Sequence, residues 1–278
     1  MSDFVAVHDS LVHIVEHGPA RPRFGTAVLL HGFPADHRLM TGAFEPVMSA
    51  RDGWRRVYVD LPGMGRSVAG ARVDSTDAVL DVVRQVVAKI VPSGPLVVAG
   101  ESYGGYLTQG LVAADPGRYA GLCLIAPAVI AEHARRTVPP AQTLVADPSS
   151  YAHLTDEQRA DVESIAVVQD ARVVHRMHDE IIVGTEIADE AAVQRISGAY
   201  TGAFEASPVE HFDGPSLLVA RRQDNVVGYA DQWALLERFP RMTCAVLDRA
   251  GHNVHLKQEV LFTALVHEWL DRVEESLA

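Results

Sequence analysis

The stretch Leu96-Val97-Val98-Ala99-Gly100-Glu101-Ser102-Tyr103-Gly104-Gly105 decides the fold of this chain. Its first four residues are continuously apolar, as is typical of a strand that is buried on both faces. Residues 100–104 match the pattern Gly-x-Ser-x-Gly, and a helix is expected from Tyr106 to Ala114. Strand, sharp turn and helix in this order hold a serine hydroxyl clear of its own backbone. The stretch therefore predicts a parallel α/β sheet with Ser102 as a nucleophile at its edge; a serine turn with a purely structural role is the alternative.

The rest of the chain repeats this alternation of short apolar runs and longer helical segments. Further buried strands are predicted at residues 27–30, 57–59, 122–125, 216–220 and 244–247. Helices are predicted at residues 77–90, 231–239 and 260–273, and in the first of these valines recur at spacings of three and four. Strands that alternate with helices predict an α/β fold with a mostly parallel sheet.

The segment from 128 to 207 departs from this alternation. It contains helical segments without an obvious strand between them, and Thr155 with Gln158 fits a capping box at the start of one of them. Helix is expected from there to Gln169 and again from Glu186 to Tyr200. We interpret 128–207 as a helical cap over a site, between core segments 1–127 and 208–278; a long crossover that contacts no ligand is the alternative.

Composition limits the partners of this chain. It has 278 residues, of which 48% are hydrophobic, and a formal charge of −12, from 24 Lys and Arg against 36 Asp and Glu. Such a charge repels phosphate backbones and anionic lipid heads, so neither nucleic acid nor a membrane is an expected partner. A small-molecule substrate is expected, and the oligomeric state is left open.

The expected location is the cytoplasm. The first residues lack the basic and apolar regions of a secretory signal, and no run of 18 apolar residues occurs. The two cysteines, Cys123 and Cys244, lie in apolar runs and are expected to be buried core residues rather than a disulfide framework.

A serine hydroxyl needs a base to take its proton, and His252 is the best placed of the 13 histidines. It follows the last predicted strand in Gly251-His252-Asn253, which puts it at the carboxyl edge of the sheet with Ser102. His255 is the second choice, and His31 is interpreted as a residue that shapes its loop. His175 and His178 could share one helix face and bind a metal, but a third ligand is not evident and a solvated face is the preferred interpretation.

The acid that orients this base is predicted to be Asp224, which follows the strand at 216–220. Ser102, Asp224 and His252 then occur in the order Ser, Asp, His, which distinguishes one fold from the other serine-hydrolase folds. Asp248 and Asp60 are competing acids, and Asp60 is better interpreted as fixing its own loop.

Two backbone N–H groups are expected to stabilise the oxyanion of the tetrahedral intermediate. One belongs to Tyr103, directly after the nucleophile, and the other to Phe33 in the loop His31-Gly32-Phe33-Pro34.

These pieces together resemble a capped member of the α/β-hydrolase superfamily. The matching segments are His31-Gly32-Phe33-Pro34, Asp60-Leu61-Pro62-Gly63-Met64-Gly65-Arg66-Ser67, Gly100 to Gly105, Asp224 with Val226-Val227-Gly228, and Gly251-His252-Asn253. The resemblance implies an eight-stranded, mostly parallel sheet, a cap inserted after the sixth strand, and an oxyanion hole formed by Phe33 and Tyr103. Serine at position 102 disfavours dehalogenase and epoxide hydrolase activity, since those enzymes have Asp there. Glu101 and Tyr103 depart from the Gly-Gly-Ser-Trp-Gly usual in proline iminopeptidases.

The expected function is hydrolysis of a small to medium carboxylic ester or thioester through an acyl-enzyme. Carbon–carbon bond hydrolysis with the same three residues is one alternative, and a ligand-binding sensor with weak activity is another. No cofactor and no metal is expected, since residues 60–67 lack the Gly-Lys-Ser/Thr ending of a phosphate loop and a third glycine for a dinucleotide fingerprint. Residues that could line the substrate pocket are Phe33, Met64, Tyr151, Tyr200 and Phe204.

Overall fold

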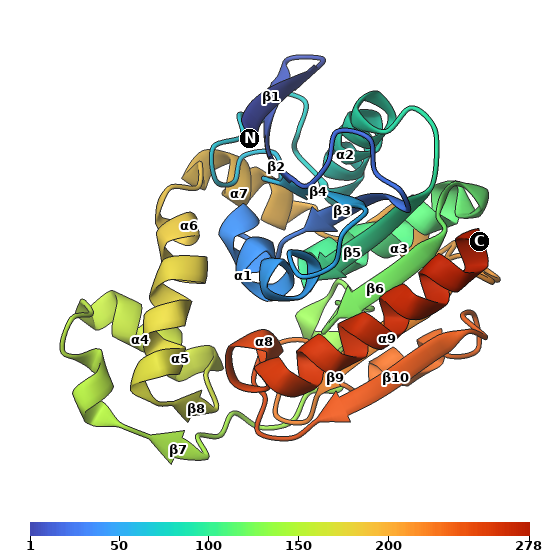
Figure 1. Ribbon diagram of the computed structural model, residues 1–278. Helices are drawn as coiled ribbons and strands as arrows, with labels where there is room; N and C mark the ends of the chain where they lie inside the picture. The colour runs from blue at the N-terminus through green and yellow to red at the C-terminus, as the bar shows by residue number, and fades with distance from the viewer.

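An eight-stranded sheet forms the centre of the molecule (Figure 1). The computed structural model describes all 278 residues, with every side chain except that of Val254. The strands are β1 (Ser2–Val7), β2 (Ser10–His17), β3 (Gly25–Leu30), β4 (Trp54–Val59), β5 (Leu96–Glu101), β6 (Gly121–Ile125), β9 (Ser216–Arg221) and β10 (Met242–Leu247). Their order is β1-β2-β4-β3-β5-β6-β9-β10. The β1–β2 and β2–β4 pairs are antiparallel and all the others in this sheet are parallel, so the expected mostly parallel α/β-hydrolase sheet is confirmed.

Helices cover both faces of the sheet. Helices α2 (Thr76–Ile90) and α3 (Tyr103–Ala114) pack with Val28 and Leu30 of β3 in one core cluster. Helices α1 (His37–Met48) and α9 (Glu259–Leu277) pack with Ala27 and Leu29 of the same strand in the other. Because successive strand residues point to opposite faces, a strand covered on both sides is apolar throughout.

The first two strands and α1 were not predicted from their own residues. Strand β2 buries Ser10 and His13 among Val12 and Ile14, and these polar side chains obscure its apolar pattern. They are tolerated because each has a hydrogen-bond partner: Ser10 Oγ accepts from Gly70 N–H, and His13 contacts Asp60. Conversely, the helix expected at 231–239 is a 3₁₀ turn over Asp231–Leu235 (η6).

A long segment between β6 and β9 forms a lobe at one side of the sheet (Figure 1). Its helical elements are α4 (Asp156–Ile165), α5 (Ala171–Met177), a π-helical turn (His178–Ile182), α6 (Val183–Glu186) and α7 (Glu190–Gly198), with 3₁₀ turns at 133–135, 148–151 and 203–205. The predicted capping box is present: Thr155 Oγ1 accepts from Gln158 N–H, and Gln158 Oε1 accepts from Thr155 N–H.

This segment is not all helical, contrary to the sequence-based expectation. Two-residue strands, β7 (Val145–Ala146) and β8 (Val168–Gln169), pair in parallel. Helix α4 ends at Ile165, before the buried, β-branched Val167 and Val168, and the N–H groups of Leu144 and Val145 both donate to the Val167 carbonyl. None of the helices in the described residues is both long enough and apolar enough to cross a lipid bilayer.

Candidate active site

Ser102 occupies a strained turn between β5 and α3. Its φ is 53° and its ψ is −112°, in a region that residues with a side chain seldom adopt. Both flanking glycines are required by close packing: a Cβ on Gly104 would lie 2.1 Å from the Leu30 carbonyl oxygen, and one on Gly100 would lie 2.3 Å from that of Gly104. Close packing of α3 against β3 and β5 therefore holds the turn in place. The Ser102 hydroxyl lies within hydrogen-bond distance of His252.

The structure brings Ser102, His252 and Asp224 together from loops at the carboxyl edge of the sheet. Nε2 of His252 lies 2.9 Å from Oγ of Ser102. Nδ1 of His252 lies 3.0 Å and 3.2 Å from the two carboxylate oxygens of Asp224. Hydroxyl, imidazole and carboxylate are thus within hydrogen-bond reach of one another in series, which is the geometry of a nucleophile, a base and an orienting acid.

Asp224 is fully buried and remains ionised because of its partners. Burial by itself would raise the pKa of this carboxyl, but the His252 imidazole, the Arg221 guanidinium and the Val227 N–H stabilise the anion and hold its pKa below the usual range. Val226 N–H and Val227 N–H donate to Oδ1 at 2.9 and 3.0 Å. The carboxylate is therefore fixed in both charge and orientation.

A buried ion pair lies beneath the turn. Arg221 Nη2 donates to Glu101 Oε1 at 3.0 Å, and Nη1 of the same guanidinium lies 3.7 Å from Asp224 Oδ2. Arg221 is 0% exposed and Glu101 is 2% exposed. Through Arg221, the residue before the serine is linked to Asp224, the carboxylate that contacts His252. Sequence analysis missed this connection because 120 residues separate Glu101 from Arg221.

The two N–H groups expected to bind an oxyanion flank Ser102. Gly32 lies against the serine, since a Cβ there would be 3.3 Å from Ser102 Cβ, and Phe33 follows it. The ring of Phe33 packs edge-on against that of Tyr103, with 5.3 Å between centroids. Neither the Phe33 N–H nor the Tyr103 N–H is bonded to an acceptor in the described part of the chain.

A cavity of ≈ 230 Å³ opens above Ser102 and His252. Two of the five residues expected to line a substrate pocket, Phe33 and Tyr200, lie on its wall. Tyr200 comes from the inserted segment, and its ring contacts those of Phe33, Tyr103 and Tyr106. The remaining lining residues are Gly32, Ala35, Leu39, Glu101, Arg136, Ile165, Ile181, Val226 and Asn253.

Met64, Tyr151 and Phe204 lie elsewhere, which corrects the expectation that they line this pocket. Met64 is fully buried in the core on the α2–α3 face of the sheet. Tyr151 belongs to the inserted segment's own core and donates its hydroxyl proton to Gln169. Phe204 packs on Tyr106 and lines a separate, small cavity. Each of these side chains instead packs outside the cavity wall.

The competing histidines and acids have other partners. His31 is fully buried, and its Nε2 accepts from Leu61 N–H at 2.9 Å, so it fixes the loop after β4 to the loop after β3. His255 is also buried, with Nε2 3.1 Å from Glu180 Oε2. Asp248 accepts from Gln223 rather than from His252. His175 and His178 both lie near Asp179, and His175 is 69% exposed.

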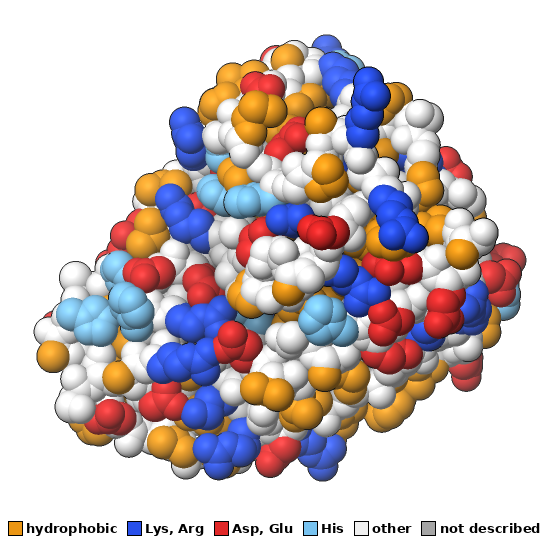
Figure 2. Space-filling model, in the orientation of Figure 1, with side chains coloured by type: hydrophobic (Ala, Val, Ile, Leu, Met, Phe, Trp, Pro, Cys, Tyr) orange, Lys and Arg blue, Asp and Glu red, His pale blue; other side chains and the backbone are white. Residues whose placement is uncertain are grey.

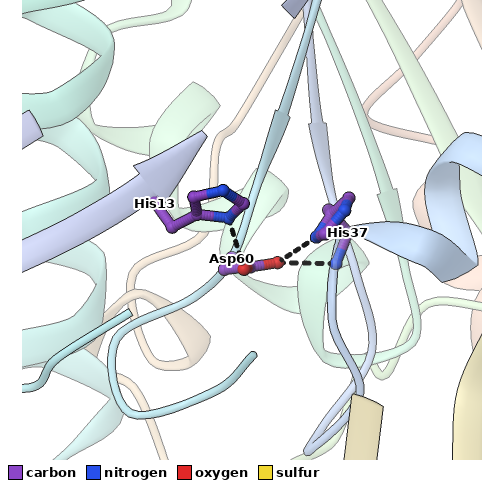
Figure 3. Close-up of side chains that lie close together, drawn as sticks. All are labelled: His13, His37 and Asp60. Carbon is purple, nitrogen blue, oxygen red and sulfur yellow. Dashed lines mark hydrogen bonds and ion pairs between the residues drawn. The ribbon is translucent and has the colours of Figure 1, made fainter. Parts of the chain in front are cut away.

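Asp60 contacts His13 and the half-buried His37. This cluster is the one group in the described residues whose side chains come close enough to suggest a metal site (Figure 3). The contacts are hydrogen bonds: Nδ1 of His13 lies 2.7 Å from Oδ2, and Nδ1 of His37 lies 2.8 Å from Oδ1. Two ligand atoms on one tetrahedral zinc ion, each about 2.1 Å from it, would be roughly 3.4 Å apart. The Nδ1 atoms therefore donate protons to Asp60. The cluster joins β2 to the first residue of α1 and to the loop after β4.

Comparison with known proteins places the chain in a family. The family described as serine aminopeptidase, S33, matches residues 22–259. The structure is similar to that of an α/β superfamily hydrolase from Oenococcus oeni, with a TM-score of 0.86, 25% identity, and coverage of 94% of this chain and 96% of that one.

More distant structures share the fold. An esterase from Exiguobacterium antarcticum superposes with a TM-score of 0.70 at 16% identity over 98% of this chain and 100% of the other. A hydrolase from Pseudomonas aeruginosa PA01 superposes with a TM-score of 0.71 at 14% identity over 97% and 98%. No curated protein matches the sequence. With an α/β-hydrolase sheet, a serine at the strained turn after β5 and a family match over most of its length, the chain belongs to the serine aminopeptidase S33 family of α/β hydrolases and is a serine hydrolase.

Proposed function

We propose that the protein hydrolyses a carboxylic ester or thioester of small to medium size through an acyl-enzyme on Ser102. The observation that supports this most is the series of contacts from Ser102 Oγ to His252 and from His252 to Asp224. The ≈ 230 Å³ cavity, with its largely apolar wall, suits an acyl group of modest length.

The first half of the reaction forms the acyl-enzyme. His252 Nε2 takes the proton of Ser102 as Oγ attacks the carbonyl carbon, and the carbonyl oxygen becomes an oxyanion. The N–H groups of Phe33 and Tyr103 act as the oxyanion hole. His252 then passes its proton to the leaving alcohol or thiol, and the C–O or C–S bond breaks.

The second half releases the acid. His252 removes a proton from water, the resulting hydroxide attacks the acyl carbon, and the proton returns to Ser102 as the carboxylic acid leaves. Asp224 stabilises the imidazolium in both halves, as a buried carboxylate held ionised by its neighbours can. The inserted segment acts as a cap, because Tyr200, Ile165 and Ile181 contribute to the wall of the cavity.

The test is hydrolysis of 4-nitrophenyl esters of graded chain length by the wild type, Ser102→Ala and Ser93→Ala. Ser93 is exposed and lies before β5, at the opposite end of that strand from Ser102, so its variant serves as the matched control. We expect Ser102→Ala to lose at least about 10³-fold in kcat, because residual catalysis without the nucleophile comes from binding and the oxyanion donors alone. Retained turnover in Ser102→Ala would refute the mechanism. Labelling of Ser102 by a fluorophosphonate without turnover of any ester would refute ester hydrolysis while leaving an activated serine.

A further inference from the structure

We propose that the substrate carries a carboxylate, in addition to the bond that is cleaved, and that Arg136 binds it. This inference rests on the proposed hydrolysis at Ser102 and specifies the class of substrate: half-esters of dicarboxylic acids, or esters with a carboxylate on the leaving group. Arg136 lines the same cavity as Ser102 and His252.

The guanidinium of Arg136 is held in place by backbone carbonyls. Nε donates to Ile130 O at 2.7 Å, Nη2 to Ala131 O at 2.7 Å, and Nη1 to Val226 O at 3.0 Å. These bonds come from two loops, one after β6 and the other after β9, so the side chain is fixed before any ligand arrives. A guanidinium has five N–H donors, of which these bonds use three.

Arg136 has no acidic partner among the described residues, where no carboxylate oxygen lies within 4.0 Å of it. By contrast, two other arginines with little exposed surface, Arg221 and Arg176, are paired with Glu101 and Glu180. The chain has 36 acidic residues for 24 basic ones, and charges of both signs are interspersed over the surface in Figure 2. Acidic residues are thus plentiful, so their scarcity does not explain why the partly buried Arg136 lacks an acidic partner.

The residues that line the cavity with Arg136 are compatible with a substrate that has a carboxylate and a short carbon chain. Glu101 also lines the cavity, but its Oε1 is bonded to Arg221. Burial raises the pKa of Tyr200, against the opposing effect of the Arg136 guanidinium, so the phenol stays protonated at neutral pH and can donate to a carboxylate. Apolar side chains complete the wall: Leu39, Ile165, Ile181 and Val226.

A pair of matched substrates tests the proposal: the 4-nitrophenyl half-ester of glutaric acid and 4-nitrophenyl pentanoate. A second pair, 4-carboxyphenyl butyrate and phenyl butyrate, puts the carboxylate on the leaving group. The enzymes are the wild type, Arg136→Gln, Arg136→Lys and, as a matched control, Arg135→Gln at the exposed neighbouring position.

In at least one pair we expect the wild type to favour the carboxylate substrate. Arg136→Gln should then lower the ratio of kcat/KM for charged over neutral substrate by about 10- to 100-fold, mainly through KM, because a charge-assisted hydrogen bond is lost. Arg136→Lys should recover part of the ratio, and Arg135→Gln should leave it unchanged. Equal losses on the charged and the neutral substrate in both pairs would show that Arg136 only supports the loops, and would overturn the proposal.

The outcomes separate this inference from the proposed function. Ser102-dependent hydrolysis of the neutral esters without preference for either carboxylate substrate would overturn the inference and leave the function intact. No hydrolysis of any of the four esters would count against the function itself. If Arg136→Gln fails to fold, inhibition of the wild-type enzyme tests the proposal instead. Glutarate should inhibit hydrolysis of the neutral ester competitively, whereas glutaramide should not. Equal inhibition by the two compounds would refute the role of Arg136.

Discussion

Glu101 and Arg221 show how a single pair of residues supports the site. Both are buried, and Nε and Nη1 of Arg221 have no hydrogen-bond partner in the described residues. Taking two charges out of water is costly, so such a pair adds little net stability, yet removal of one partner leaves the other charge buried and unbalanced.

We therefore expect Arg221→Met to reduce the free energy of unfolding by about 3–5 kcal/mol, because Glu101 would be left unpaired. The double variant Glu101→Gln/Arg221→Met should be more stable than Arg221→Met alone. Urea unfolding followed by circular dichroism measures both. The exposed Arg222→Met is the control and should change stability by less than about 1 kcal/mol. A double variant no more stable than the single one would contradict this view of the pair.

The glycines that flank Ser102 are expected to be required for both stability and activity. Gly104→Ala should destabilise the fold by about 1–3 kcal/mol and lower kcat, because its Cβ would collide with the backbone of Leu30 and displace Ser102. A Cβ on Gly198 would have no atom within 4 Å, so Gly198→Ala should be neutral or slightly stabilising. Thermal unfolding and ester hydrolysis by the two variants provide the comparison, and similar behaviour of both would argue against a packing requirement at position 104.

Asp60 connects three parts of the fold: β2, α1 and the loop that follows β4. Its carboxylate accepts from His13 Nδ1, His37 Nδ1, His37 N–H and Arg66 N–H. These bonds hold its pKa below the usual range in spite of burial. Four donors on two carboxylate oxygens make this residue the link between β2, the start of α1 and the loop after β4.

Asp60→Asn tests that anchor. The amide keeps one acceptor oxygen and presents an NH₂ group to donors, so at least one buried N–H loses its partner, at a cost of about 1–3 kcal/mol. The shift in the urea midpoint relative to Asp52→Asn, at an exposed position, measures the effect. Equal midpoints for the two variants would mean that the cluster does not support the fold.

For the whole molecule, buried histidines link stability to pH. Burial is the largest cause that lowers the pKa of His13, His31 and His255 below the ordinary value of 6.5. Between that value and the lower folded pKa the unfolded chain binds more protons than the native state. Stability is therefore fully present above about pH 6.5 and decreases as the pH falls. Carboxyls with lowered pKa values, among them Asp60, Asp224 and Glu180, act in the same direction but only below about pH 4.5.

The window from pH 6.5 to 5 thus isolates the histidines. We expect the free energy of unfolding to fall through this window, by up to about 1.4 kcal/mol per pH unit for each such histidine. Gln in place of His31 can accept from Leu61 N–H without titrating, so His31→Gln should have the shallower slope. Urea unfolding at several pH values determines both slopes, and a wild-type stability that is constant across the window would contradict the expectation.

The sheet could be predicted largely from local patterns. The apolar runs at 27–30, 96–99 and 216–220 lie within β3, β5 and β9. The turn at Ser102 could also be predicted, because its glycines and its flanking strand and helix are contiguous. Strands β1 and β2 could not, since the buried polar residues of β2 are satisfied by partners far along the chain, such as Asp60 for His13.

Most of the cavity wall could be identified only from the tertiary structure, since two of the five residues expected there, Phe33 and Tyr200, lie on it. The sequence by itself determined the α/β class, the strained serine turn and the candidate order of serine, acid and base, because each follows from short-range periodicity or from the residues that directly follow a strand. Only the tertiary structure shows that Tyr200 lines the cavity whereas Tyr151 packs within the inserted segment. It also shows that Arg136 lines the same cavity as Ser102. Side chains of one type compete for burial at many sites, and which site each one occupies depends on contacts between segments that the sequence separates.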